Sequence, residues 1–468
     1  MENKKKIILI IFYVAHYCSG QFFYTNYQEA DHWLMTNDGI HLNSDSDTAN
    51  IWSNYKIRKN IRYGNAHHFG IFFNAIDNSN LNLIQEKSDL IGNGLLTNYR
   101  FLLPNLEITN SMFFTYDKNE ATRGFVRTIK NITMYTNQAY LKFASSKKNG
   151  GVMFKIGRDF LIEGDGNDSK IFFSDYSRPF DQLSIKANYK QIHGRFAAIS
   201  LDSLSNYNRY LYMHTLEYIT KKLRLRFGEA VISSGFNESI DIKLLNPFNL
   251  WSWENLGSSN KGLNAFLYSG FSWMPKSGLR IYGELLIDDI NFHKENAFFL
   301  NKYAYLLGFQ KTSFPLNSSN MWFEYSNVLN QVYQSFHHSH IYTHRGFPIG
   351  HYLGNDFQNY RFHYSQIFKS KISKAFIDIS YLINGSNSLK TPFDNPWEDS
   401  SGNFINSYRH PGFPTPPLSL SFNFNLGVEI ELRKLTYMII TIENQKYSNS
   451  NIKSQISLRF WSYLEIKK

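Results

Sequence analysis

The sequence predicts an all-β protein, a transmembrane antiparallel β-barrel of about 18 strands. Three observations support this class: an aromatic content of 17%, a mean hydropathy of only −0.38, and repeated alternation of apolar and polar residues. Barrel strands direct apolar residues to lipid and polar residues to the lumen, which combines many aromatic residues with low mean hydropathy. Beyond the first 20 residues, no stretch approaches the ~18 apolar residues of a membrane-spanning helix. A large soluble β-protein is the alternative.

The N-terminus has the pattern of a secretory signal peptide over residues 1–20. Lysines at 4–6 precede an apolar segment at 7–15, and small residues precede a predicted cleavage before Gln21. Cys18 lies in the removed segment, so the mature chain has no disulfide. Tyr17 argues against lipidation of Cys18, which requires a small preceding residue. We therefore expect an exported protein.

The charge of the mature chain is strongly positive. Without the signal peptide, the 49 basic and 38 acidic residues become 46 and 37, a formal charge of +9. A basic excess favours acidic partners. At the expected location, the cell outer membrane, the acidic partners are lipopolysaccharide, other membrane lipid and acidic polysaccharide. Nucleic acid is not an expected partner there.

Strand patterns extend along the mature chain. The clearest runs from 418 to 432, where even positions are apolar and most odd positions are polar. It exceeds the roughly 9 to 11 residues that cross a bilayer. Similar runs occur at 279–288, 375–383 and 456–464, with shorter ones at 69–73, 140–143, 152–157, 195–201, 223–227, 303–309, 321–325 and 360–364.

Turn signals separate these strands. Residues 147–151 and 275–278 have the composition of hairpin tips, and a proline-rich connection after Asn384 is expected to be an external loop. At roughly 25 residues for a strand with its connection, the mature chain would form about 18 strands. We assign residues 21–60 to a short periplasmic segment and 61–468 to the barrel.

Three groups of polar residues could form a metal-binding or catalytic site, but each has a simpler structural explanation. Histidines between His337 and His351 could bind a metal, but no Cys or carboxylate has helpful spacing, which favours a polar loop. Asp288 and Asp289 point to opposite faces of a strand, which favours a strand end over a paired site. The acidic stretch 165–168 lacks the full pattern of a calcium loop.

Four passages resemble the capsule assembly protein Wzi family, and they occur in the family's order across roughly residues 150–360. They are Gly157-Arg158-Asp159-Phe160 through Gly166 with Ser174-Asp175 and Pro179-Phe180-Asp181; Phe227-Gly228-Glu229-Ala230-Val231 with Leu245-Asn246-Pro247-Phe248; Tyr282-Gly283-Glu284 through Ile290; and Tyr342-Thr343-His344-Arg345-Gly346 through His351 with Leu353-Gly354-Asn355-Asp356. The sequence departs from the family at residues 163–166, where a Trp-Gly-Pro-Gly-like stretch is usual. It also shows no periplasmic helical pattern in residues 21–60.

The resemblance implies an eighteen-stranded barrel with a plugged lumen. It also implies a lectin-like, non-catalytic role in attaching capsular or exopolysaccharide at the cell surface. Related barrels of gliding bacteria suggest a motility accessory as a variant. The alternatives are a porin or other transport channel and an outer-membrane enzyme, although no Gly-x-Ser-x-Gly element occurs.

The expected site is a polysaccharide-binding surface without catalytic residue, metal or cofactor. Arginine pairs with uronic carboxylates, and aromatic rings stack on sugar faces; for the tryptophans, an interfacial aromatic belt is the alternative. The candidates are Arg158, Asp175, Asp181, Trp251, Trp253, His344, Arg345 and His351. The sequence leaves the identity of the sugar and the oligomeric state open.

Overall fold

A computed structural model describes most of the chain from residue 66 onward. It covers residues 66–76, 94–102, 105–115, 127–129, 132–147, 149–174, 176–252, 263–289, 301–335, 337–368, 372–390, 412–433, 436–447 and 453–467. The predicted signal peptide, the segment 21–60, Asp175 and Trp253 lie outside these residues. No helix in the described part of the chain is long and apolar enough to cross a bilayer.

The protein is mostly β and antiparallel, as predicted. The strands are β1 (Ala66–Ile76), β2 (Gly94–Leu102), β3 (Leu106–Thr115), β4 (Arg127–Ile129), β5 (Ile132–Lys147), β6 (Gly150–Asp159), β7 (Phe180–Tyr189), β8 (Ile192–Ser200), β9 (Asn208–Ile219), β10 (Leu223–Gly235), β11 (Leu263–Lys276), β12 (Leu279–Asp289), β13 (Lys302–Thr312), β14 (Ser319–Val328), β15 (Thr343–His344), β16 (Phe347–Pro348), β17 (Phe357–Ile367), β18 (Ile372–Asn384), β19 (Ser419–Arg433), β20 (Thr436–Tyr447) and β21 (Lys453–Lys467). Two short 3-10 helices, η3 (Ile242–Leu245) and η4 (His338–His340), lie in connections.

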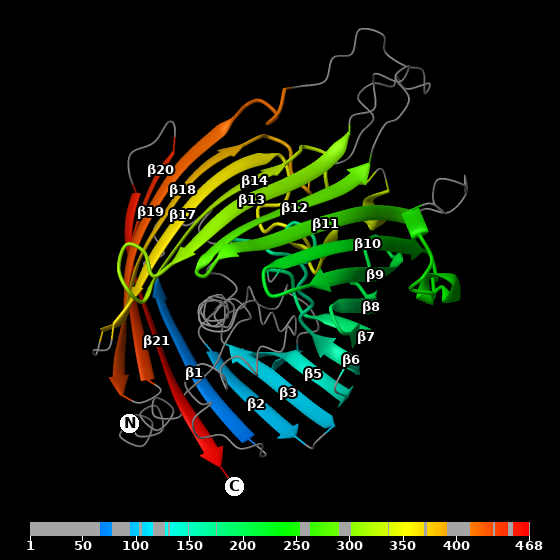
Figure 1. Ribbon diagram of the computed structural model, residues 1–468, viewed down its shortest axis with the longest axis horizontal. Coiled ribbons are helices and arrows are strands. Elements are labelled where there is room, and N and C mark those ends of the chain that lie inside the picture. The colour runs from blue at the N-terminus through cyan, green and yellow to red at the C-terminus, as the bar shows by residue number, and fades with distance from the viewer. Residues whose placement is uncertain are drawn as a thin grey trace.

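One curved sheet of 19 strands contains every strand except β15 and β16, which form a separate pair. Neighbours in the sheet follow chain order, and β1 pairs with β2 on one side and with β21 on the other. The first and last strands of the chain therefore lie side by side (Figure 1).

The strongest sequence patterns became strands. The alternating run at 418–432 is β19, and the run at 279–288 is β12. Both predicted hairpin tips are confirmed, because Lys147 pairs with Gly150 and Lys276 pairs with Leu279. The sequence patterns did not predict β2, β3, β4, β7, β9, β11, β15, β16 or β20.

Alternation decides which face of each strand is outward. In β19, Phe422 and Leu426 are exposed, whereas Ser421 is buried. In β12 the order is the same: Leu285 is exposed, and the neighbouring Glu284 is buried. In both strands these exposed positions are apolar, whereas the inward positions include polar residues such as Ser421 and Glu284.

This arrangement predicts unequal effects of one substitution at adjacent positions. Leu426→Arg places a charge on the outer face near the middle of β19 and should cost about 2–4 kcal/mol of folding free energy in lipid. Asn425→Arg points inward beside Asp378, its cross-strand neighbour, and should be far milder. Refolding into vesicles with denaturant titration measures both; equal losses would contradict the assigned faces.

The two ends of the sheet differ in their connections. One end has short turns, such as those at 190–191, 220–222 and 277–278, and Ala66 of β1 meets Lys467 of β21 there. The other end has longer loops, including residues 160–179, 236–262 and 329–356. We refer to these as the short-turn end and the long-loop end.

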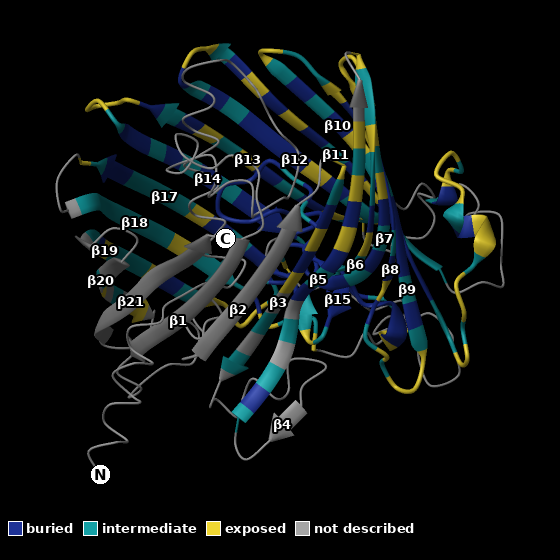
Figure 2. Cartoon of the chain, turned by 90° about the horizontal axis from the view of Figure 1, so that it is seen from below, coloured by how far each residue is buried: buried dark blue, intermediate teal, exposed yellow. Residues whose placement is uncertain are grey.

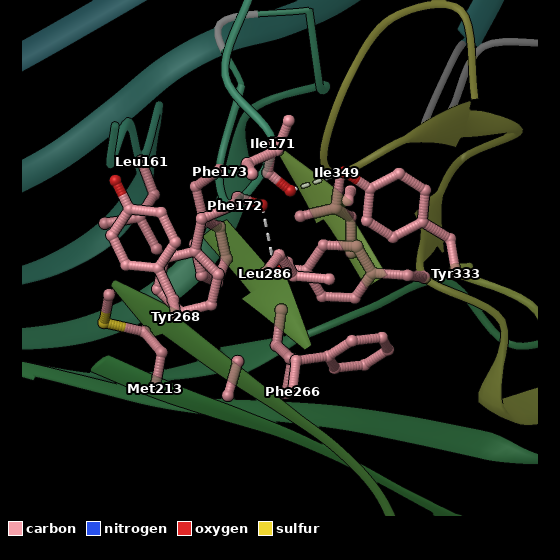
Figure 3. Close-up of a cluster of buried hydrophobic side chains, with 14 of the residues drawn as sticks. Leu161, Ile171, Phe172, Phe173, Met213, Phe266, Tyr268, Leu286, Tyr333 and Ile349 are labelled. Carbon is pink, nitrogen blue, oxygen red and sulfur yellow. Dashed lines mark hydrogen bonds between the residues drawn. The ribbon is translucent and has the colours of Figure 1, made fainter. Parts of the chain in front are cut away.

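Two loops from the long-loop end fold back against the inner face of the sheet. We call residues 160–179 the first inner loop and residues 329–356 the second inner loop. Ile171, Phe172 and Phe173 of the first are fully buried, as are Tyr333 and Tyr342 of the second. They share one hydrophobic cluster with inward side chains of the strands, including Met213, Phe266 and Leu286 (Figure 3).

Candidate functional site

Charged pairs attach the first inner loop to the strands. Asp165 lies 2.8 Å from Arg224 of β10. Glu163 pairs with Arg195 of β8, and Asp168 pairs with Arg361 of β17. Side chains from three separate strands therefore fix one short loop, and Asp165 and Asp168, which loosely resemble a calcium loop, have arginine partners.

Two glutamates on the inner face bind the backbone of the same loop. Glu284 of β12 accepts hydrogen bonds from the N–H groups of Gly166 at 2.6 Å and Ile171 at 3.0 Å, and from that of Asp165. Glu324 of β14 accepts those of Asn167 at 2.6 Å and Asp168 at 3.2 Å. A buried backbone N–H without a partner is costly. These carboxylates therefore satisfy N–H groups that lie between the two ends of the loop's own Glu163–Phe173 bridge.

The second inner loop packs on the first and is held by a buried arginine. Tyr333 Oη donates to the carbonyl of Ile171 at 2.5 Å, and Tyr342 Oη donates to that of Phe172 at 3.0 Å (Figure 3). Arg209 of β9 donates to three carbonyls of the second loop, those of Ser339, Ile341 and Thr343.

The predicted candidates Arg158, Asp181 and Arg345 come together at the long-loop end. Arg158 Nε donates to Asp181 Oδ1 at 2.8 Å, and its Nη2 donates to Oδ2 at 2.6 Å. Arg345 Nη2 lies 3.6 Å from the same carboxylate, whose side chain remains 39% exposed. Burial, and next the charge of Arg158, lower the pKa of Arg345 to about 10, which leaves it protonated at neutral pH.

Further residues that sequence reasoning missed complete this group. The Arg178 guanidinium lies 4.6 Å from the ring centroid of Phe347, which lies two residues after Arg345. We define the arginine cluster as Arg158, Arg178 and Arg345 with Asp181 and Asp202. Asp202 also lies 3.3 Å from Nη1 of the buried Arg209, so it links the cluster to β9. Arg178 directly precedes the motif Pro179-Phe180-Asp181, which could have identified it as a site residue. No sequence pattern pointed to Asp202.

Asp202 connects the cluster to another predicted residue, His344. His344 Nδ1 lies 3.3 Å from Asp202 Oδ1 and 3.3 Å from its backbone nitrogen. Burial lowers the pKa of His344. Burial alone would raise the pKa of Asp202, but the hydrogen bond with His344 and the backbone N–H of Arg345 hold it below its usual value. His344 therefore positions Asp202 and the turn at Arg345 from a buried place.

Two other candidates, Trp251 and His351, are buried in the structure. Trp251 has no exposed surface and stacks on His214 with ring centroids 4.3 Å apart. His351 is equally buried, against Tyr352 and Phe357. Trp251 belongs to a segment that folds back on the outer face, which local composition does not reveal.

The aspartates at the end of β12 have separate roles, as predicted. Asp288 accepts the Tyr333 N–H at 2.7 Å and so holds the second inner loop. Asp289 lies 3.7 Å from Lys302 at the start of β13.

Comparisons with known proteins support the fold. No family model and no curated protein sequence matches the chain. Among solved structures, it is similar to Wzi of Escherichia coli, described as an outer-membrane protein involved in group 1 capsule assembly and a carbohydrate-binding β-barrel. The TM-score is 0.57 at 13% identity over 90% of this chain and 87% of that one. OpdK, an outer-membrane protein of Pseudomonas aeruginosa, gives a TM-score of 0.47 at 9% identity over 86% and 98%. The likeness to Wzi, which is described as a β-barrel, supports the fold.

Proposed function

We propose that this protein is an outer-membrane β-barrel that binds an acidic polysaccharide at the cell surface and retains it there. The sheet would close as a barrel of about eighteen long strands, and the two inner loops would plug its lumen. Such barrels have short periplasmic turns and longer extracellular loops. The long-loop end, and with it the arginine cluster, then faces the outside.

The arginine cluster is the observation that carries this proposal. The planar guanidinium group binds carboxylates through two parallel hydrogen bonds, and uronic sugars present such carboxylates. The cluster brings three guanidinium groups together, and Asp181 is the more exposed of its two carboxylates. A polymer carboxylate can therefore compete with Asp181 for Arg158 and Arg345, while the exposed turn at Gly346 leaves room for a chain.

The test is binding of purified full-length protein to immobilised polygalacturonate, with neutral dextran as the reference polymer. Charge-assisted hydrogen bonds contribute about 1.5–3 kcal/mol each, so Arg178→Ala with Arg345→Ala should weaken binding at least about tenfold. The matched control is Lys221→Ala with Lys276→Ala, which removes the same charge at the opposite end. Equal effects of the two double variants, or equal binding of dextran, would overturn the proposal.

Salt should weaken this binding without abolishing it. Exposed charges are screened over ~8–10 Å at physiological ionic strength, whereas arginine pairs in partly buried positions are screened less. Repeating the polygalacturonate titration from low to high salt measures how steeply the binding constant falls with salt concentration. This dependence should be weaker in the Arg178→Ala, Arg345→Ala double variant. An unchanged salt dependence in that variant would place the contact elsewhere.

A further inference from the structure

The connection between β10 and β11 folds over the outer face of the sheet. We call residues 236–252 the outer flap, which lies outside the strands at the green end of β10 (Figure 1). Trp251 of the flap packs on Phe196, Tyr212 and Val231 in a cluster separate from the inner one. Tyr212 alternates with Leu211 and Met213, which belong to the inner cluster, so the flap covers the opposite face.

Polar contacts fix the flap to the wall. Glu229 of β10 accepts the Trp251 N–H at 2.9 Å and the Ser252 N–H, and it lies 3.3 Å from His214 Nε2. Tyr212 Oη accepts the Asp241 N–H at 2.9 Å. The flap therefore has a defined position on the outer face.

Between the flap and the short-turn end lies an apolar groove of about 1410 Å³. Outward side chains of β6–β12 form its floor, and Phe248 and Leu250, 92% and 64% exposed, line its flap side. Exposed residues of these strands appear as yellow bands in Figure 2. Gly194 leaves free space in the floor of the groove, because a Cβ there would meet no atom within 4 Å. The apolar residues that line the groove include Val152, Ile185, Ile192, Leu216, Phe227, Leu267 and Leu285.

One basic turn borders the groove at the short-turn end, and two more lie farther along the same end of the sheet. Tyr189 and Ile192 line it, and the exposed Lys190 lies in the turn between them. The next two turns along the sheet carry exposed lysines at 221, 222 and 276. The turn sequences 190–191, 220–222 and 276–278 contain no Asp or Glu. The groove thus joins an apolar floor to a positively charged end.

We propose that this groove binds one anionic phospholipid of the periplasmic leaflet, with its acyl chains along β6–β11 and its headgroup at the turns bearing Lys190 and Lys222. The inference rests on the proposed membrane barrel, because the short-turn end is periplasmic only in that setting. Apolar lining selects hydrocarbon, and lysines near a membrane surface attract anionic lipid. The lysines distinguish this occupant from a second copy of the chain, whose short-turn end would carry the same positive charge.

The test uses full-length protein in detergent, titrated with phosphatidylglycerol or phosphatidylcholine of identical acyl chains and read by native mass spectrometry. Wild-type protein should retain one phosphatidylglycerol with at least about tenfold preference, since each lysine can contribute about fivefold. Lys190→Ala with Lys222→Ala should remove the preference. Gly194→Phe should reduce binding of both lipids, because the ring fills the groove. Lys390→Ala, an exposed lysine at the long-loop end, should change nothing.

The outcomes separate the lipid site from the barrel itself. Equal retention of both lipids, or full retention in the Gly194→Phe variant, would overturn the lipid site. A dimer that Gly194→Phe dissociates would also overturn it, with a second copy as the occupant. The same preparations are tested for heat-modifiable migration and outer-membrane fractionation. Failure of those two tests would refute the proposed barrel, whereas success without lipid binding would refute this inference alone.

Discussion

Replacing residues 161–178 with a short glycine–serine linker should turn an electrically silent protein into a steadily conducting one. Most of this first inner loop is buried against the inner face of the strands, and its contacts reach β8, β10, β12, β14 and β17. In the proposed barrel, a loop bound on so many strands would exclude water and ions from the lumen. Planar-bilayer recordings of wild-type and deleted proteins measure the change.

The outer flap provides the control for this deletion. Replacing residues 238–249 with a similar linker shortens a connection at the same end but leaves the interior untouched, so it should remain silent. Steady conductance of the wild-type protein would favour a transport channel. Silence of the protein without the first inner loop would contradict its role as the plug.

Glu284→Ala should release the first inner loop without removing it. The substitution leaves the buried N–H groups of Asp165, Gly166 and Ile171 without their acceptor. Each such group costs about 1–3 kcal/mol, so the loop should lose about 3–9 kcal/mol of its attachment. Limited proteolysis should then cleave within residues 160–179 of the folded protein, and channel openings should appear.

Glu284→Gln is the matched comparison for the alanine variant. The amide keeps one oxygen that can accept the Asp165 and Gly166 N–H groups, but its NH₂ group opposes the N–H of Ile171. We expect partial protection from the protease. If alanine and glutamine variants resist the protease like the wild-type protein, Glu284 does not anchor the loop.

The strands were predictable because their signal is local. Alternation at 418–432 and 279–288 requires only that neighbouring residues point to opposite faces. Those runs became β19 and β12 with the apolar side outward. β2 and β9 were not predicted, because polar and apolar residues do not alternate regularly along their sequences. Their hydrogen-bonded neighbours place them in the sheet.

The site was only partly predictable, because contacts distant in the sequence form it. Arg158, Asp181 and Arg345 were identified from short motifs, yet the proximity of Arg345 to Asp181 depends on the second inner loop returning across the sheet. Glu284 contacts Gly166 across 118 residues. Trp251 was a candidate for sugar contact and is buried, because the outer flap folds back onto Glu229 of β10, the strand that leads into it. Local sequence describes a loop's composition but not the face it covers.

The most direct test of the proposed function is the distribution of acidic polymer between cells and medium. It compares a deletion strain complemented with wild-type protein, with the Arg178→Ala, Arg345→Ala variant, or with the Lys221→Ala, Lys276→Ala control. A uronic acid assay on washed cells and on medium gives both fractions. We expect total polymer to be unchanged, cell-bound polymer to fall in the deletion and arginine strains, and the lysine control to match the wild type. Loss of synthesis, or unchanged cell-bound polymer with reduced uptake of a small solute, would contradict retention and indicate transport.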